Sequence, residues 1–307
     1  MHVGSLVAAL ASRCQALASN GRWMLRIDDI DPPREVAGAS ASIIRTLERF
    51  GFSWDGPVRY QSERLARYEE ALRRLAADGR LYRCRCTRRQ LRGLPRYPGT
   101  CRPPRGGTAH DVAPGDAAHR SDPGEAAADV GAPVLSSRPL ATPSTTALRV
   151  RLDGRAELED GVQGTLAGRH ADTCGDVILR RRDGLVAYPL ACAVDDADVR
   201  EVVRGADLLE ASIAQQALLE LLGSGSPAWA HVPVALDASG LKLGKSTGAP
   251  PLDECAPLPT LLDVWRFLGQ APLPVDSLDA FWREAPRRWS LAAVPRERAR
   301  PLTTSPA

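Results

Sequence analysis

Two lysines stand out in this 307-residue chain, because of its 40 Lys and Arg residues only Lys242 and Lys245 are lysines. An ammonium group is compact, strongly hydrated and carried on a flexible stem, so it can follow a phosphate that moves during a reaction. The surrounding glycines predict a mobile loop: Gly240, Gly244 and Gly248. A solvated surface loop is the alternative for a K-x-x-K pattern, but the scarcity of lysine favours a loop that handles phosphate.

The first residues form a second candidate site for an anion. His2, Gly4 and Ser5 come directly before an Ala- and Leu-rich stretch, 6–17, that predicts a helix. The free N–H groups and the dipole at a helix N-terminus favour a bound anion. A capped first helix without a ligand explains the same residues.

Acidic residues follow the first predicted strand. Residues 23–27 predict a buried strand, and Asp28, Asp29 and Asp31 come after it. Ligands of open α/β sheets bind beyond the carboxyl ends of strands. An acidic turn before the two following prolines explains these residues equally well.

Three cysteines close together predict a structural zinc site. Cys84, Cys86 and Cys101 lie in one arginine-rich segment, and thiolates at such spacing can close a small tetrahedral site. The spacing leaves the fourth ligand open between Tyr97 and His110, and scattered reduced thiols remain the alternative. The seven cysteines show no paired spacing, which is typical of a cytosolic protein without disulfides.

The elements that must position these residues alternate between strands and helices. Helical spacing covers 34–50 and 62–78, with Ser62 as N-cap, and 208–222, with Asp207 as N-cap. Shorter helices are expected near 261–268 and 277–284, strands at 148–152, 176–180, 201–204 and 231–236, and a frayed tail after residue 295.

The pattern predicts five parts within one α/β protein. Segment 103–146 consists mostly of small and polar residues and is expected to be disordered, because it cannot bury enough apolar surface to offset ordering entropy. The parts are the first half of a Rossmann-like parallel-sheet core, a zinc-bearing insertion, the low-complexity segment, the second half of the core, and the lysine loop with a short helical C-terminal part: 1–80, 81–102, 103–147, 148–236 and 237–307.

Composition bounds the class of protein. The length allows two or three domains, and 44% hydrophobic residues fit a globular protein. A net charge of +3 does not require a polyanionic partner, but arginine clusters in 83–105 and 283–300 permit RNA binding. No apolar run is long enough to span a bilayer, so we expect no membrane association. We also expect a cytoplasmic protein and a monomer.

Five segments, in this order, resemble the signatures of class I aminoacyl-tRNA synthetases of the glutamyl type. Residues 2–5 are similar to the first signature, H-x-G-H, with Ser5 in place of the second histidine, and 242–246 are similar to the second, K-M-S-K-S. The remaining matches are 25–34, 175–184 and 203–209. Each match is modest alone, but five in order are specific, and they cover most of 1–102 and 148–250.

Within this family the chain resembles the short form that acts on queuosine-containing tRNA(Asp). Only residues 251–307 follow the lysine loop, whereas ordinary glutamyl-tRNA synthetases continue into long anticodon-binding domains. The cysteine pattern is similar to the zinc site of that short form, which implies Tyr97 as the fourth ligand. The resemblance implies that ATP activates L-glutamate without tRNA, and that glutamate is then esterified to the queuosine base at the wobble position of tRNA(Asp).

The resemblance also implies roles for individual residues. His2, Gly4, Ser5 and Lys245 would bind ATP with Mg²⁺, and His2, Lys242 and Lys245 would be catalytic, the lysines neutralising the departing pyrophosphate. The residues implied to bind glutamate are Asp28, Tyr188 and Arg204, and those implied to hold zinc are Cys84, Cys86, Tyr97 and Cys101.

Three departures from the family pattern bear on activity. Asp28 is one methylene shorter than the family glutamate, and Gly244 replaces a serine. The family's opening strand is not found ahead of Met1, so we expect the natural protein to begin upstream. The alternatives are a truncated, catalytically impaired relative that binds nucleotide or tRNA, and a zinc-stabilised RNA-binding module, which would leave the two lysines unexplained.

Overall fold

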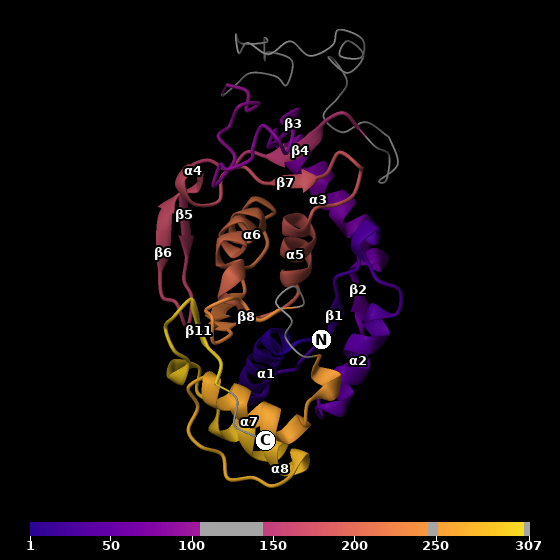
Figure 1. Ribbon diagram of the computed structural model, residues 1–307. Coiled ribbons are helices and arrows are strands. Elements are labelled where there is room, and N and C mark those ends of the chain that lie inside the picture. Colours follow the sequence, from indigo (N-terminus) through magenta and orange to yellow (C-terminus); the bar gives the residue numbers. More distant parts are fainter. Residues whose placement is uncertain (105–143, 245–250, 304–307) are drawn as a thin grey trace.

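A computed structural model describes residues 1–104, 144–244 and 251–303. Figure 1 shows an elongated molecule with a three-stranded sheet at one end and helices α7 (Pro257–Phe267) and α8 (Leu278–Arg288) at the other. The amino terminus lies in the middle of the viewed face, near α1 (Val3–Ala18) and β1 (Arg26–Ile27).

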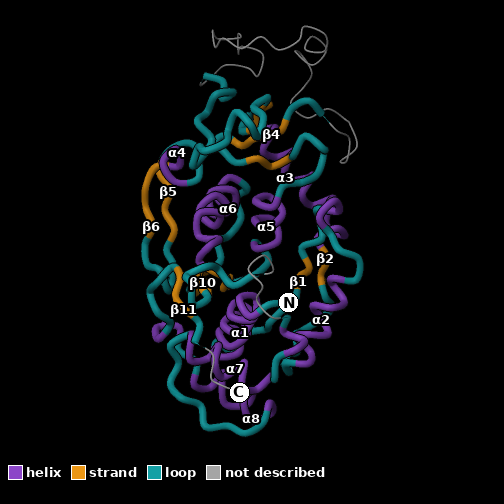
Figure 2. The backbone as a smooth tube through the Cα atoms, viewed as in Figure 1, coloured by secondary structure: helices purple, strands orange, loops and turns teal. Residues whose placement is uncertain are grey.

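Parallel strand pairs form the centre of the molecule. β1 pairs with β2 (Arg59–Tyr60), β8 (Glu201–Gly205) with β9 (Ala228–Val232), and β10 (Val234–Leu236) with β11 (Ala299–Pro301), each in parallel. Helix α1 contacts β8, β9 and β10. The predicted α/β class with parallel strands is confirmed, although in the described ranges these strands form three separate pairs (Figure 2).

The first predicted strand is much shorter than expected. Only Arg26 and Ile27 form β1. Trp23 lies in the core around α1, where its indole donates a 2.5 Å hydrogen bond to Ser12. A cavity of about 640 Å³ lies between the C-terminal half of α1, the segment before β1 and the start of β8. A further strand ahead of Met1 stays a prediction.

The cysteine segment is attached to an antiparallel sheet. This sheet contains β3 (Leu81–Cys84), β4 (Ala147–Val150) and β7 (Ile178–Arg180), in that order. Cys84 pairs with Ala147, just after the low-complexity segment, and Arg151, just after β4, donates to the Pro103 carbonyl at the start of that segment. Its predicted disorder lies outside the described residues.

Two large apolar cores hold these elements. The first includes α1, α2 (Ala39–Arg49), α7 and α8, and the second includes α3 (Leu65–Ala77), α5 (Tyr188–Asp196) and α6 (Leu209–Leu221). Hairpin β5 (Arg155–Leu158) and β6 (Leu166–Arg169), followed by α4 (His170–Thr173), covers one side of α6. No helix in the ranges given above is long and apolar enough to cross a membrane.

Three local predictions were wrong for related reasons. Ser62 lies in a 3₁₀ turn before α3 and hydrogen-bonds Asp29, and Asp207 lies in a 3₁₀ turn before α6, where its carboxylate binds Lys242 instead of capping the helix. The tail after residue 295 is not frayed over its described part, because β11 pairs with β10. In each case a partner distant in sequence replaced the expected local arrangement.

The packing of α1 can be tested by removing one buried side chain. Leu10 is fully buried in the first core, so Leu10→Ala is expected to lower the free energy of unfolding by about 2–5 kcal/mol. Val36→Ala, at a side chain that is 68% exposed, should change it by less than about 0.5 kcal/mol. Denaturant unfolding monitored by circular dichroism measures both. Equal effects would contradict the placement of α1 in the core.

Candidate active site

The start of α1 is arranged to meet an anion. His2 has an extended backbone, its carbonyl accepts hydrogen bonds from the N–H groups of Ser5 and Leu6, and its ring Nε2 lies 3.2 Å from Ser5 Oγ. The first turn of α1 contains no acidic side chain. The positive end of the helix dipole is therefore not offset locally, and a phosphate would be favoured there.

Residues 241–244, the described part of the predicted lysine loop and here called the lysine segment, lie against the start of α1. A Cβ atom on Gly4 would be 3.0 Å from the carbonyl oxygen of Leu243, so only glycine allows this approach without a shift. The Leu243 N–H donates to Ala235, and the Leu252 N–H donates to the Met1 carbonyl. Leu243 therefore lies between β10 and Gly4, and Leu252 lies beside Met1, whereas predicted residue Lys245 lies outside the described residues.

Lys242 is held near the carboxyl end of β8. Its ammonium nitrogen is 2.5 Å from Asp207 Oδ2, and Asp207 is the second residue after β8. Both side chains are about half exposed, at 55% and 40%. The lysine therefore faces solvent beside the strand that carries Arg204.

Two of the three residues predicted to bind glutamate, Asp28 and Arg204, are connected through one charge network. Asp28 follows β1 and accepts a 2.7 Å hydrogen bond from Arg26, whose Nη1 is 2.7 Å from Asp196. Asp196 Oδ2 is 3.8 Å from Arg204 Nη1. Tyr188 begins α5, the helix that also carries Asp196.

Arg204 is buried and fixed from several sides. Its guanidinium donates to Gln215 of α6 and lies over Trp229, with Cζ 4.7 Å from the ring centroid. The Trp229 indole donates in turn to Gln216, at 2.9 Å. This arrangement restricts the rotamers of Arg204 and so pre-organises a cationic fork.

Burial controls protonation around Arg26. It raises the pKa of Cys192 to about 12, so this thiol is neutral near pH 7. Burial also raises the pKa of Asp196, although Arg26 and Arg204 oppose the effect.

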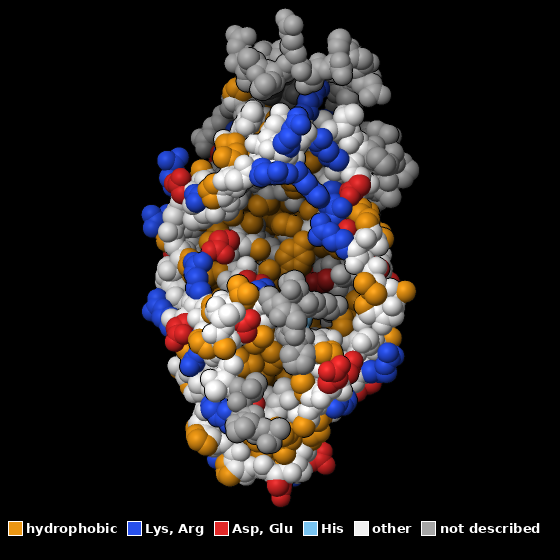
Figure 3. All heavy atoms as spheres, in the orientation of Figure 1, with side chains coloured by type: hydrophobic (Ala, Val, Ile, Leu, Met, Phe, Trp, Pro, Cys, Tyr) orange, Lys and Arg blue, Asp and Glu red, His pale blue; other side chains and the backbone are white. Residues whose placement is uncertain are grey.

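Figure 3 shows that the face carrying the amino terminus is hollowed, with apolar side chains inside. Lys and Arg side chains gather along the rim of the hollow on the side of β3, β4 and β7. A concave surface with a basic rim suits an anionic partner.

The three predicted thiol ligands come together as expected. The sulfur atoms of Cys84, Cys86 and Cys101 lie within 4.8 Å of one another. Cys86 Sγ is 3.6 Å from Cys101 Sγ, and Cys84 Sγ is 3.6 Å from the Tyr97 hydroxyl oxygen. Sulfur atoms that share a tetrahedral zinc ion lie about 3.8 Å apart, so the donor set fits this metal. The hydrogen bond with Cys101 lowers the pKa of Cys84, which favours the thiolate.

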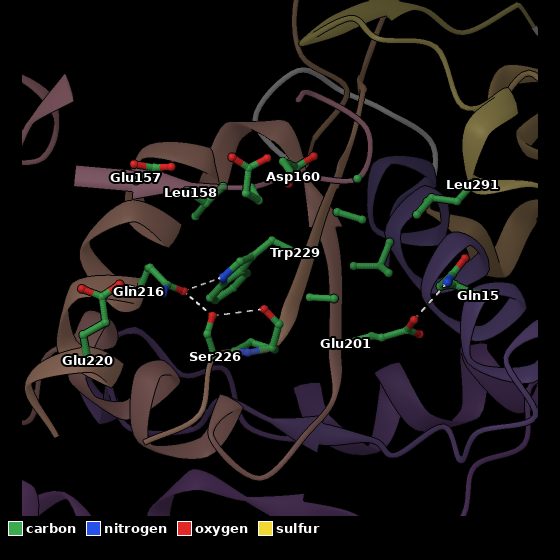
Figure 4. Close-up of a pocket in the computed structure, with 16 residues that line it drawn as sticks. Gln15, Glu157, Leu158, Asp160, Glu201, Gln216, Glu220, Ser226, Trp229 and Leu291 are labelled. Carbon is green, nitrogen blue, oxygen red and sulfur yellow. Dashed lines mark hydrogen bonds between the residues drawn. The ribbon is translucent and has the colours of Figure 1, made fainter. Parts of the chain in front are cut away.

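A separate cavity of about 570 Å³ does not fit a nucleotide. Its lining includes five carboxylates and no lysine or arginine: Glu157, Glu159, Asp160, Glu201 and Glu220 (Figure 4). These acidic groups would repel a triphosphate. None of the predicted site residues lines this cavity.

A buried Ser–His–Asp chain adjoins that cavity but cannot act as a nucleophilic triad. His231 lies 2.6 Å from Ser212 Oγ and 2.5 Å from Asp160 Oδ2. Ser212 and His231 are both fully buried, so no substrate reaches the hydroxyl. The chain instead links β9 to α6, beside Arg204.

Comparisons with known proteins show the family to which the chain belongs. Residues 1–250 match the family of class I tRNA synthetases (E and Q), catalytic domain. The chain is 42% identical over 306 residues to the glutamyl-Q tRNA(Asp) synthetase of Pseudomonas syringae pv. syringae, covering 97% of this chain and 92% of that protein. It is 41% identical over 309 residues to the enzyme of the same name from Aromatoleum aromaticum, with 97% and 87% covered.

The chain belongs to the glutamyl-Q tRNA(Asp) synthetase family. This confirms the family indicated by the sequence signatures. Two solved structures share the fold at 20% identity: a glutamate tRNA ligase from Elizabethkingia meningosepticum, with a TM-score of 0.69, and the glutamate-tRNA synthetase from Elizabethkingia anophelis, with a TM-score of 0.70. Each match covers 99% of this chain, but only 65% and 66% of those longer chains.

The network around Arg204 was not predicted from the sequence. Arg26, Asp196, Gln215 and Trp229 have ordinary residue types at unremarkable spacings, and only their contacts in space reveal them. The pair Asp195–Asp196 at the end of an apolar stretch was the one available signal, because carboxylates in such a position require partners.

The acidic end of α5 has a testable pH dependence. Hydrogen bonds from Arg67, together with those from Arg64, lower the pKa of Asp198 to about 2 from its ordinary 3.8. The ionised group therefore stabilises the fold above about pH 4, and this contribution is lost as the pH falls through 2. Asp198→Asn should lower the free energy of unfolding at pH 7, with the difference disappearing near pH 2.

Urea unfolding of both proteins at pH 2 to 7 measures this difference. Asp276→Asn is the matched control, because Asp276 is exposed. A pH-independent difference for Asp198→Asn would contradict the ion-pair explanation.

Proposed function

We propose that this chain is an aminoacyl-tRNA synthetase-like ligase that activates L-glutamate with ATP in the absence of tRNA. It then transfers the glutamate to the queuosine base at the wobble position of tRNA(Asp). The names of its relatives support this substrate pair. The close approach of Leu243 to Gly4 carries the proposal, because it unites the lysine segment with the first helix.

In the first step, a carboxylate oxygen of glutamate attacks the α-phosphorus of ATP. A new P–O bond forms, the bond to the pyrophosphate breaks, and glutamyl-adenylate results. Catalysis of this step requires positioning and charge stabilisation more than covalent chemistry by the protein. His2, Gly4 and Ser5 would bind the phosphates at the start of α1, and Lys242 with Lys245 would neutralise the departing pyrophosphate. Mg²⁺ would accompany the nucleotide.

Glutamate would be recognised by the network at the ends of β1 and β8. Arg204 offers a fixed guanidinium to a carboxylate, and Asp28 offers a carboxylate to the ammonium group. Asp28 would share its charge between this ammonium group and Arg26. Tyr188 would contact the substrate from the first turn of α5.

In the second step, a hydroxyl group of the modified base attacks the acyl carbon of the adenylate. An ester bond forms and AMP leaves. The arginines of the segment around the thiols would contact the tRNA phosphates. A cytoplasmic location and a monomeric state stay predictions.

The two steps can be measured separately. With glutamate and Mg²⁺, the protein should catalyse ATP–pyrophosphate exchange without tRNA. It should also transfer labelled glutamate to queuosine-containing tRNA(Asp) and not to tRNA(Glu). Nucleotide binding without exchange would instead support a catalytically impaired relative, and charging of tRNA(Glu) would exclude the proposed acceptor.

The contact between the two signature segments gives a sharper version of this experiment. Gly4→Ala places a methyl group 3.0 Å from the Leu243 carbonyl oxygen and should reduce exchange by roughly tenfold, because displacing catalytic groups is costly. Gly225→Ala adds the same group in open space and should leave exchange unchanged. Equal rates for both variants would show that the close approach does not matter for adenylation.

We also propose that Cys84, Cys86, Tyr97 and Cys101 hold one structural zinc ion. The distances between their donor atoms support a four-ligand site, and such an ion would tie the loop to β3. Arg149, whose Cζ lies 3.7 Å from the Tyr97 ring centroid, places a compensating positive charge beside the thiolates.

Metal analysis tests this site directly. The purified protein should contain one zinc per chain, and Cys101→Ser should lose most of the metal and unfold at a lower temperature. Cys255→Ser is the matched control, because Cys255 lies in a distant turn and should not affect zinc content. Full zinc content in Cys101→Ser, or none in the parent protein, would contradict the assignment.

A further inference from the structure

A cavity of about 440 Å³ lies between the thiol-bearing segment and the body of the molecule. One wall comes from residues 91–97, and the other comes from β7 and the start of α5. None of its lining residues belongs to α1 or to 241–244, so it is distinct from the proposed ATP-phosphate site.

The position of this cavity relates it to acyl transfer. Ala187 and Pro189 line it, and they flank Tyr188 on both sides. Consecutive Cα atoms are about 3.8 Å apart, so the cavity begins one residue from a side chain proposed to contact glutamate. A group bound in the cavity would therefore contact the residues on both sides of Tyr188, although Tyr188 itself does not line the cavity.

The cavity has an apolar surface that is partly open to solvent. Leu91, Leu94, Val177 and Ile178 contribute apolar side chains. Leu94 is 47% exposed, and it is one of only five large apolar residues that are exposed in the described ranges. Tyr188 is another of these five, so two unprotected apolar groups lie in or beside one cavity.

Three guanidinium groups and one carboxylate, that of Asp176, add charge to the walls. Arg96, Arg149 and Arg181 line the cavity, and Arg149 is buried with its Nε lacking a hydrogen-bond partner in the described part of the chain. A buried donor without a partner is costly unless a ligand or a water satisfies it. Outside the cavity, the same segment exposes four more arginines: Arg85, Arg88, Arg89 and Arg92.

Apolar and guanidinium surfaces together are typical of sites that take a nucleobase from single-stranded RNA. Such bases stack on apolar or arginine side chains, while nearby arginines contact the flanking phosphates. A base whose own substituent reacts must first leave the stack of its loop. The volume of the cavity is within the range of ordinary small-ligand pockets.

We propose that this cavity receives the extruded wobble base of the tRNA anticodon loop. The exposed arginines of 85–92 would hold the neighbouring phosphates, and the base would present its hydroxyl toward the acyl group beside Tyr188. This inference rests on the proposed function, because it assigns the place of the acceptor in the second step. It predicts that the first step is independent of the cavity.

Leu94→Asp tests this separation, because it puts a negative charge on the apolar wall without touching the glutamate network. Glutamate-dependent ATP–pyrophosphate exchange should stay within about twofold of the parent protein. Transfer to queuosine-containing tRNA(Asp) should fall by roughly tenfold or more in kcat/KM, as expected for the loss of one stacked base. Leu65→Asp, at an exposed leucine of α3 outside the cavity, is the matched control and should transfer normally.

Leu94→Trp provides a second variant that fills the cavity without changing charge and should also impair transfer selectively. Zinc content and thermal unfolding of each variant show whether the segment remains folded. Normal transfer by both Leu94 variants would overturn the inference, and so would an equal loss of exchange and transfer. Absence of exchange in the parent protein would instead refute the proposed function.

Discussion

The start of α1 lies against the lysine segment at a residue that carries no side chain, Gly4. The Leu243 carbonyl oxygen is placed where a Cβ atom on Gly4 would be 3.0 Å away. Backbone hydrogen bonds at Leu243 and Leu252 hold the segment on both sides of this contact. Two signatures from opposite ends of the 1–250 match therefore share one place. The proposed binding of ATP depends on that proximity, because phosphate would meet the helix terminus and the lysines together.

A buried network of alternating charges joins β1, α5 and β8. Asp196 lies within salt-bridge distance of Arg26 on one side and of Arg204 on the other. Asp196 and Arg204 are largely removed from solvent. Burial of single charges is costly, but mutual pairing offsets much of that cost. Its consequence is rigidity, since Trp229 and Gln215 hold Arg204 in one orientation. A fixed guanidinium needs little reorganisation when a carboxylate binds, which agrees with the proposed recognition of glutamate.

The thiol segment and the body of the molecule share a wall through β4 and β7. Arg149 of β4 stacks on Tyr97 and donates to the Asp176 carbonyl, so it connects the proposed zinc site to the sheet. The end of β7 continues toward the first turn of α5. A metal in the loop would thus stabilise one side of the proposed base-binding cavity. Activation of glutamate and recognition of the acceptor would then both depend on the same elements, β4, β7 and the start of α5.

Local sequence patterns were sufficient to predict a feature wherever its interacting residues are close in the chain. The cysteine cluster was predictable because Cys84, Cys86 and Cys101 share one short segment, which limits how far their thiols can separate. The first helix and the order of the family signatures were also readable from the sequence. The grouping of Asp28, Tyr188 and Arg204 was implied only by resemblance, and the structure connects Asp28 to Arg204 through Arg26 and Asp196.

Other features depended on partners that the sequence does not name. Ser62 and Asp207 have the residue types of helix caps, yet Asp29 and Lys242 compete successfully for their side chains. The tail after residue 295 has no strong sequence pattern, yet part of it forms β11 by pairing with β10.

The sequence by itself therefore determined the family, the α/β class and the thiol cluster, because these rest on local spacing or on ordered signatures. Only the tertiary structure decided which polar side chains pair, how Arg204 is held and where a cavity opens. Short polar residues can be satisfied equally well by a neighbour or by a distant group, and folding alone brings the distant group within reach.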